Sequence, residues 1–187
     1  MKTIRGIIVH QTGSPTAAGT LSSYQNANAN GAHFLIDKDG SIYQVASLFK
    51  KTWHVGKLRA KCLEAHTCSA AVLKANAGLR YSEVDRLEMR KSVPDRFPSN
   101  DDSIGIELVG LCVLDRKYVR AGMSKEQTDQ LTAKFGVFEA VTPAQNQALK
   151  RLILKIQGER AVPENEVYPH SEVSRKNMTE ASTARWK

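Results

Sequence analysis

Two histidines stand where a side chain could do chemistry, because each follows a short apolar stretch and leads into a polar loop. His10 closes the run Ile4–Thr12, IRGIIVHQT, whose β-branched residues Ile7 to Val9 predict a strand buried on both faces. His170 repeats the pattern in VYPHSEVSRK. In open sheets, strand ends that meet surface loops often carry ligands. Either histidine alone could cap its strand and bond a nearby carbonyl, but the pair favours a functional site.

A carboxylate, Glu107, interrupts an otherwise apolar strand predicted over Asp102–Gly110, DSIGIELVG. Ile104, Ile106 and Leu108 alternate along it, which is the periodicity of a strand. A carboxylate in such a strand is costly unless it has a partner or a task. Glu107 is therefore either half of a structural ion pair or a catalytic acid or base.

The elements that must position these residues include a predicted hairpin. Phe34–Ile36 and Ile42–Val45 form its strands, because Asp39-Gly40 between them favours a tight turn. A third short strand is predicted over Lys51–Gly56, KTWHVG. That strand would set His54 beside Trp53, where His54 either lines a site or makes a structural bond.

Helix starts are readable from their capping residues. Ser124 begins one helix with a capping box, and Thr142 begins another with Pro143 at its first position. Gly158 is expected to end the second helix. Its apolar stripe, which we expect to pack on the sheet, consists of Leu149, Leu152, Ile153 and Ile156. Further helices are expected over Thr20–Asn28 (with Leu21 and Tyr24 inside), Ala60–Leu79, Ser82–Arg90 and Thr179–Lys187.

Composition places the chain among ordinary globular domains. It has 187 residues, of which 41% are apolar and 25% charged, and it contains no apolar run long enough for a membrane helix. The net charge of +8 favours an anionic partner, although a solubility surface is an equal alternative. With 6% aromatic residues and no basic stripe, nucleic-acid binding is disfavoured.

The N-terminus and the cysteines bear on the compartment. MKTIRGIIVHQTG has too short an apolar core for a signal peptide, so we expect synthesis in the cytoplasm without one. None of the three cysteines forms a CxxC pair. Cys62 and Cys68 could close a small disulfide loop in an oxidising compartment, but two free thiols fit the sequence equally well.

Six motifs in order resemble the zinc-dependent N-acetylmuramoyl-L-alanine amidases, which include recycling amidases, phage amidases and peptidoglycan recognition proteins. These motifs are IIVHQT, GAHFLIDKDGSIYQV, TWHVG, DSIGIELVG, TPAQNQALKRLI and HSEVSRK. The resemblance covers about two-thirds of the chain and implies one α/β domain over residues 1–187. That domain would have a central mixed β-sheet flanked by helices, with a zinc groove at one end. Residues 57–100 and 112–140 look like insertions.

The resemblance also implies an activity, the hydrolysis of the amide between N-acetylmuramic acid and L-alanine of the stem peptide by a zinc-activated water. His10 and His170 match zinc ligands. Glu107 matches the acid of the family's SIGIE strand, which would move the proton of the water, and Lys176 would stabilise the oxyanion. TWHVG matches the substrate groove, and we expect Trp53 and His54 to bind substrate there.

The third zinc ligand is less plain in the sequence. The family has Asp or Cys two residues after its lysine, but Met178 stands at that distance from Lys176 and is a poor zinc ligand. Glu180 lies ten residues after His170, the spacing of the recycling branch, and we predict that it is the ligand. Alternatively, Glu180 is not a ligand but a charged residue at the start of a C-terminal helix. Glu172 is the rival ligand, and Met178 is expected in the core.

The sequence is compatible with several functions. The main alternative to an active amidase is an inactive peptidoglycan-binding module of the same fold. Without a visible signal peptide, the enzyme would act on recycled fragments, or reach the cell wall in the periplasm as an antibacterial effector or a phage lysin. We expect the partners to be peptidoglycan or muropeptides and, if the protein is an effector, an immunity or secretion protein. We also expect a monomer that does not insert into membranes.

Overall fold

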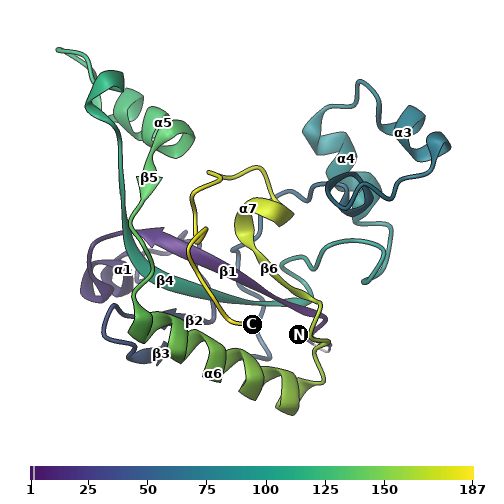
Figure 1. The fold of residues 1–187 in the computed structure, drawn as a ribbon, viewed down its shortest axis with the longest axis horizontal. Helices are drawn as coiled ribbons and strands as arrows, with labels where there is room; N and C mark the ends of the chain where they lie inside the picture. Colours follow the sequence, from purple (N-terminus) through teal and green to yellow (C-terminus); the bar gives the residue numbers. More distant parts are fainter. Residues whose placement is uncertain (2) are drawn as a thin grey trace.

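The fold is built on a six-stranded mixed sheet in the order β3-β2-β4-β1-β6, with β5 paired to the end of β4 (Figure 1). The computed structural model describes Met1 and residues 3–187. Its strands are β1 (Gly6–Gly13), β2 (Phe34–Ile36), β3 (Ile42–Gln44), β4 (Ser103–Val113), β5 (Val137–Phe138) and β6 (Val167–Pro169). β1 pairs in parallel with β4 and β6, and β2 pairs in parallel with β4 and antiparallel with β3. The predicted α/β class is confirmed.

The central strand β1 follows from its β-branched run, because such side chains pack well on a sheet that is covered on both faces. Ile7 and Val9 point into one core cluster, and Ile8 points into another on the opposite face. His10 continues the alternation on the face of Ile8. In the β1–β4 register His10 lies opposite Glu107, so both candidate residues sit side by side in the middle of the sheet.

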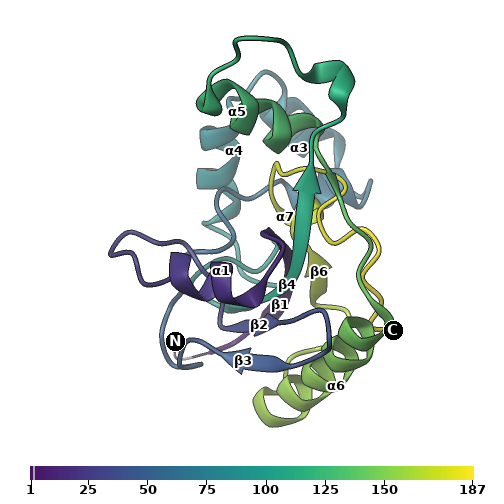
Figure 2. The same ribbon diagram turned by 90° about the vertical axis from the view of Figure 1, so that its left-hand side faces the viewer.

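Four of the helices lie toward the two ends of the molecule, and α1 and α7 lie beside the sheet between them. In Figure 2, α6 lies at the end opposite α3, α4 and α5, and in Figure 1 the chain after α7 runs between α5 and the pair α3 and α4. The helices are α1 (Ala17–Ser23), α2 (Lys61–Glu64), α3 (Ala70–Asn76), α4 (Tyr81–Glu88), α5 (Lys125–Phe135), α6 (Pro143–Arg160) and α7 (His170–Val173), with a 3-10 turn η1 (Arg116–Tyr118). In the described part of the chain, no helix has the length and apolar character to cross a membrane.

Helix α6 closes the larger core, and its start is the predicted capping box. The hydroxyl of Thr142 accepts from the Gln145 N–H at 3.1 Å, and Gln145 Oε1 accepts from the Thr142 N–H at 3.0 Å. A cap of this kind contributes about 1 kcal/mol. The expected stripe is buried against the sheet: Leu149, Leu152, Ile153 and Ile156. The capping box at Ser124 is likewise confirmed.

The third strand predicted over residues 51–56 is wrong, because this segment forms no regular element. Its backbone is held by a side chain instead of a neighbouring strand. Asn100 Oδ1 accepts from the N–H groups of His54 and Val55 at 2.9 and 2.8 Å. The local β-propensity is therefore overruled by a residue far along the chain.

Two helix predictions differ from the structure in the middle of the chain. The helix expected over residues 60–79 is broken into α2 and α3, because His66 takes a left-handed conformation (φ 55°) and Ser69 starts a new helix. Gly158 does not end α6, which runs to Arg160 before Ala161 turns left-handed. A glycine inside a helix costs about 1 kcal/mol relative to alanine. Burial of the apolar stripe stabilises α6 by more than this, so the helix continues past Gly158.

The two terminal helix predictions also differ. The N-terminal helix starts at Ala17 instead of Thr20, because Thr16 caps it, and it buries Ala17 and Thr20. The C-terminal segment forms turns, since tertiary partners take its polar groups. Gln11 Oε1 accepts from the Ala181 N–H at 3.2 Å, and Thr183 Oγ1 accepts from the Val141 N–H at 2.8 Å.

Candidate metal centre

The candidate residues from four separate elements meet in one cavity of about 340 Å³. β1 supplies His10, β4 supplies Glu107, α7 supplies His170, and the segment after α7 supplies Lys176 and Glu180. The parallel pairing of β1 with both β4 and β6 brings the first three together. The cavity therefore lies at the end of the sheet where β6 stops, whereas β1 continues for three residues past His10 instead of ending there as predicted.

Three buried side chains form a compact cluster inside this cavity. The ligand atoms of His10, His170 and Glu180 all lie within 4.8 Å of one another. Glu180 Oε1 is 2.9 Å from His170 Nδ1 and 3.5 Å from His10 Nδ1. Two imidazoles and a carboxylate are a common ligand set of catalytic zinc, which leaves a fourth position open. The structure thus brings together the three residues that the sequence predicted as ligands, although the prediction of their role stays a prediction.

A chain of hydrogen bonds sets the tautomer of His10. The Ser103 hydroxyl donates to the Ser99 carbonyl at 2.5 Å, so its oxygen accepts from His54 Nε2 at 3.2 Å. His54 Nδ1 then accepts from His10 Nε2 at 2.9 Å. The proton of neutral His10 is thereby held on Nε2, and its Nδ1 lone pair faces Glu180.

His170 is oriented in the same way by a backbone group. Its Nε2 donates to the Val55 carbonyl at 2.8 Å, which leaves the Nδ1 lone pair facing Glu180. Two imidazole lone pairs and a carboxylate oxygen therefore converge without a donor among them. A cation at their centre satisfies all three, so the donor set fits a zinc ion.

Burial and charge hold the cluster in a metal-binding protonation state. Burial, together with the nearby His170, lowers the pKa of His10 to about 4, so that it is neutral at pH 7. Burial alone would raise the pKa of Glu180, but the facing imidazoles of His10 and His170 favour its ionised form when they bind a second proton, which lowers the pKa to about 2. An ionised carboxylate beside neutral imidazoles is the form that binds divalent metals.

Glu107 has the opposite electrostatic situation. Burial, and then the charge of Glu180, raises its pKa to about 8, although Lys176 opposes the shift. Its Oε2 has no hydrogen-bond partner in the described part of the chain. The structural ion pair considered for this residue is not formed among the described side chains. A carboxyl group with this pKa can take up and release a proton near neutral pH.

His54 and Trp53 occupy different places in the cavity wall. Both ring nitrogens of His54 are engaged by His10 and Ser103, so the ring orients His10. Gly105 makes room for this ring, because a Cβ there would lie 2.7 Å from His54 Nδ1. Trp53 is 60% exposed and leaves its ring accessible at the rim. Trp53 is thus the better placed of the two for the substrate contact that the sequence predicted.

The remaining candidates are distinguished by exposure. Lys176 is an exposed residue that also lines the cavity. Glu172, the rival ligand, is not part of the cluster. Met178 is 66% exposed, so its predicted place in the core is wrong. Sequence reasoning missed Ser103 and Asn100, which support His54; their partners lie 49 and 46 residues away, and nothing local marks them.

Known proteins share this architecture. The family model described as N-acetylmuramoyl-L-alanine amidase matches residues 1–181. AMPDH3 from Pseudomonas aeruginosa superposes with a TM-score of 0.55 at 20% identity, over 91% of this chain and 51% of its own. The N-acetylmuramyl-L-alanine amidase AmiD from E. coli, solved with the substrate anhydro-N-acetylmuramic acid-L-Ala-D-gamma-Glu-L-Lys, gives 0.54 at 18% identity over 91% and 49%.

An AmpD derivative gives a TM-score of 0.51 at 19% identity, over 92% of this chain and 74% of its own. No curated protein sequence matches the chain. The chain spans about half the length of AMPDH3 and AmiD. At these identities, the structural similarity shows a shared fold.

Proposed function

Because the chain belongs to the N-acetylmuramoyl-L-alanine amidase family, we propose that it hydrolyses the amide bond between N-acetylmuramic acid and the L-alanine of a peptidoglycan stem peptide. The observation that carries the proposal is the convergence of His10 Nδ1, His170 Nδ1 and Glu180 Oε1 beside Glu107, whose buried Oε2 has no hydrogen-bond partner among the described residues. In this proposal the three converging residues hold a zinc ion.

A bound zinc ion supplies activation of water and polarisation of the scissile carbonyl. Glu107 is the general base and acid: its carboxylate accepts the proton of the attacking water and passes it to the leaving amine nitrogen. With a pKa of about 8 in the metal-free site, it exchanges protons readily near neutrality. Lys176 places a positive charge at the same cavity, where it stabilises the negative charge that develops on the carbonyl oxygen.

The second candidate function is a binding module that has kept the fold and lost the reaction. Binding alone does not require a buried carboxyl group without a partner, which costs folding free energy. Glu107 together with Lys176 in the metal cavity therefore favours the enzyme.

We further propose that the protein acts on the cell wall outside the cytoplasm, as an effector or a phage lysin. The Cys62–Cys68 disulfide supports an oxidising compartment. We also propose that the chain is a single amidase domain, in which residues 57–100 and 112–140 are insertions relative to the family.

The test uses the purified chain and the anhydromuramoyl tripeptide bound by AmiD. With zinc, we expect release of the free tripeptide and a new lactyl carboxyl group on the sugar, both identified by mass spectrometry. A chelator should stop the reaction and added zinc should restore it. Zinc-loaded protein that binds the tripeptide without cutting it would establish the binding module.

A further inference from the structure

Gln11, the residue after His10 in β1, is a buried polar side chain that the proposed reaction does not use. Its amide bonds two distant parts of the chain: Nε2 donates to the Glu139 carbonyl at 2.9 Å, and Oε1 accepts from the Ala181 N–H at 3.2 Å. With the amide turned over, donor would face donor and acceptor would face acceptor, so these partners determine its orientation. Gln11 therefore connects the backbone directly after Glu180 to the backbone at Glu139.

The Glu139 end of this connection is fixed on the sheet. The Glu139 N–H donates to the Leu111 carbonyl at 2.9 Å, and the Glu139 carboxylate accepts from the Leu111 N–H at 2.9 Å. The same carboxylate forms an ion pair with Lys38. Because Leu111 belongs to β4, Glu139 keeps a constant position relative to the strands, and Gln11 extends that fixed position to Ala181.

Ala181 is held in a conformation that alanine rarely adopts. Its φ is 52°, in the left-handed region, which is disfavoured for alanine by roughly a factor of ten relative to glycine. The chain changes from one face of the sheet to the other here, since Glu180 meets His10 whereas Ala181 packs in the core cluster of Ile7 and Val9. The turn at Ala181 thus sets the direction of the Glu180 side chain.

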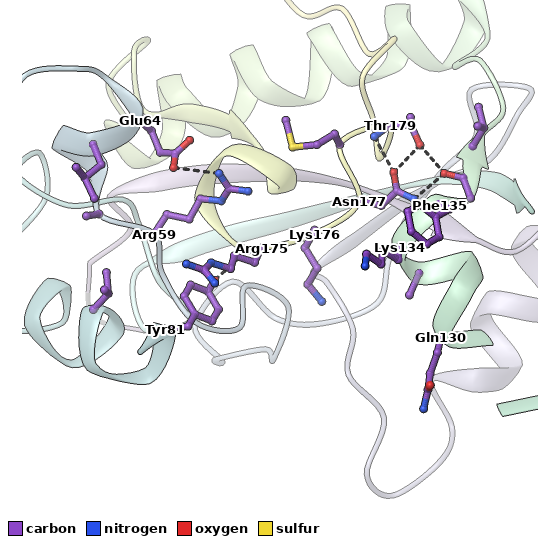
Figure 3. A pocket seen from close by; sticks show the side chains of 17 residues that line it. Arg59, Glu64, Tyr81, Gln130, Lys134, Phe135, Arg175, Lys176, Asn177 and Thr179 are labelled. Carbon is purple, nitrogen blue, oxygen red and sulfur yellow. Dashed lines mark hydrogen bonds and ion pairs between the residues drawn. The ribbon is translucent and has the colours of Figure 1, made fainter. Parts of the chain in front are cut away.

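The chain before Glu180 is anchored independently of Gln11 (Figure 3). Asn177 Nδ2 donates to the Gly136 carbonyl at 2.6 Å, and the Thr179 hydroxyl lies 3.2 Å from the same oxygen. Asn177 Oδ1 also accepts from the Thr179 N–H at 2.8 Å. These bonds fix the segment on the N-terminal side of Glu180, so the bond from Gln11 fixes the first residue on the other side.

Gly110 leaves the space that the Gln11 amide occupies. A Cβ at Gly110 would lie 1.9 Å from Gln11 Nε2 and 2.7 Å from Gln11 Cδ. The backbone of Gly110 is outside the left-handed region, so its conformation would accept any residue. It is the close approach of Gln11 that excludes a side chain at this position.

We propose that Gln11 is a positioning residue for the metal centre: its amide holds the turn at Ala181, so that the Glu180 carboxylate points at the two histidines of the cluster. The inference rests on the proposed function, because it concerns the zinc ion that the cluster would hold. Groups that orient a metal ligand typically contribute about 10–100-fold to metal affinity. Gly110 belongs to the same device, because it makes room for the amide.

The experiment begins with Gln11→Met, which keeps the length of the side chain but removes both hydrogen bonds. Zinc affinity is measured by competition with a chelator, and the visible spectrum of bound Co²⁺ reports the ligand geometry. We expect zinc to bind at least about tenfold more weakly. The Co²⁺ absorption should lose intensity, because solvent replaces a displaced carboxylate and higher-coordinate Co²⁺ absorbs less than four-coordinate Co²⁺.

The matched control is Gln145→Met, at a second buried glutamine that bonds distant backbone groups. Gln145 Nε2 donates to the Ile36 and Val109 carbonyls, at 3.2 and 2.9 Å. This residue lies in the first turn of α6 and does not line the metal cavity. The control should lower the stability to urea, as Gln11→Met does, but it should leave the zinc affinity and the Co²⁺ spectrum unchanged.

Two further variants act on the same contact in opposite directions. Gly110→Ala displaces the Gln11 amide without removing it and should reproduce the loss of zinc affinity, which keeps the test decisive if Gln11→Met does not fold. Ala181→Gly, added to Gln11→Met, should recover about fivefold or more of the lost affinity. Glycine adopts the left-handed turn without help from Gln11.

Native zinc affinity and Co²⁺ spectra in Gln11→Met or in Gly110→Ala would overturn the proposal. An equal loss in Gln145→Met, or a loss that Ala181→Gly does not recover, would overturn it too. The proposed function fails separately. If the zinc-loaded native chain never cleaves the anhydromuramoyl tripeptide but Gln11→Met still weakens zinc binding, the chain is not an amidase, while the positioning role of Gln11 stands.

Discussion

The substitution Glu107→Gln separates the catalytic role of this side chain from its effect on stability. Glutamine keeps the shape of the side chain but can neither ionise nor transfer the proton. With zinc bound, turnover should fall by a factor of about 100 or more. In the metal-free protein, the same change should increase the stability at alkaline pH, because a buried carboxylate no longer has to ionise there.

The size of the stability effect follows from the pKa. In the folded, metal-free protein the pKa of Glu107 lies at about 8, above its ordinary value of 4.5. Between these two values the folded state keeps a proton that the unfolded chain has lost, so the free energy of unfolding falls as the pH rises. A shift of this size corresponds to at most ~5 kcal/mol, fully expressed above pH 8.

The assay is urea unfolding with a chelator present, at pH 4.5 and at pH 8.5, for the native protein and for Glu107→Gln. We expect similar stabilities at pH 4.5 and a more stable variant, by about 2–5 kcal/mol, at pH 8.5. All other titrating groups are common to both proteins and cancel in the comparison. If both proteins lose the same free energy between the two pH values, Glu107 does not carry a raised pKa. If zinc-loaded Glu107→Gln turns over at a near-normal rate, Glu107 is not the base.

Three further predictions address the ligand set, the core and the delivery. Glu180→Ala should weaken zinc binding at least about 100-fold, whereas Glu172→Ala should leave it unchanged. Zinc affinity is measured by competition with a chelator. Stoichiometric zinc in folded Glu180→Ala would mean that another group completes the site. Leu149→Ala should lower the free energy of unfolding by about 2–5 kcal/mol because the side chain is fully buried, and Leu154→Ala, at a position 53% exposed on the same helix, should change it by less than about 0.5 kcal/mol. Expression with a periplasmic signal should lyse a Gram-negative host while cytoplasmic expression is harmless, and equal tolerance of both would count against delivery to the cell wall.

The elements predicted correctly from sequence are those decided by neighbouring residues. The β-branched run before His10 forms β1, and the hairpin turn at Asp39-Gly40 joins β2 to β3. The caps at Ser124 and Thr142 start α5 and α6 because their hydroxyls bond backbone groups within one turn. Local chemistry alone determines each of these features, so a single sequence carries enough information to find them.

The differences arise where a distant partner decides the local structure. The backbone at His54 bonds to Asn100, which replaces the expected strand. Gln11 takes the N–H of Ala181, which replaces the expected C-terminal helix. The tautomer of His10 depends in turn on Ser103, through the ring of His54. Such pairings have no periodicity in sequence, and only the fold brings them together.

The sequence marks the residues of the candidate site in two different ways. Burial patterns alone singled out His10 and Glu107, since a polar residue in an apolar strand needs a reason. Glu180 could be proposed only through its spacing from His170 in a family motif, because its own surroundings are polar in sequence. The structure places its carboxylate 2.9 Å from His170.

Zinc content and hydrolysis measured on the same samples test the central claim most directly. The protein is stripped with a chelator and titrated with zinc, and each sample is assayed for bound metal and for release of the tripeptide from the anhydromuramoyl substrate. We predict a rate that rises in proportion to occupancy and saturates at one zinc ion per chain, the capacity of the single three-residue cluster found among the described residues. Release that continues in metal-free protein, or no release at full occupancy, would contradict a zinc-dependent amidase.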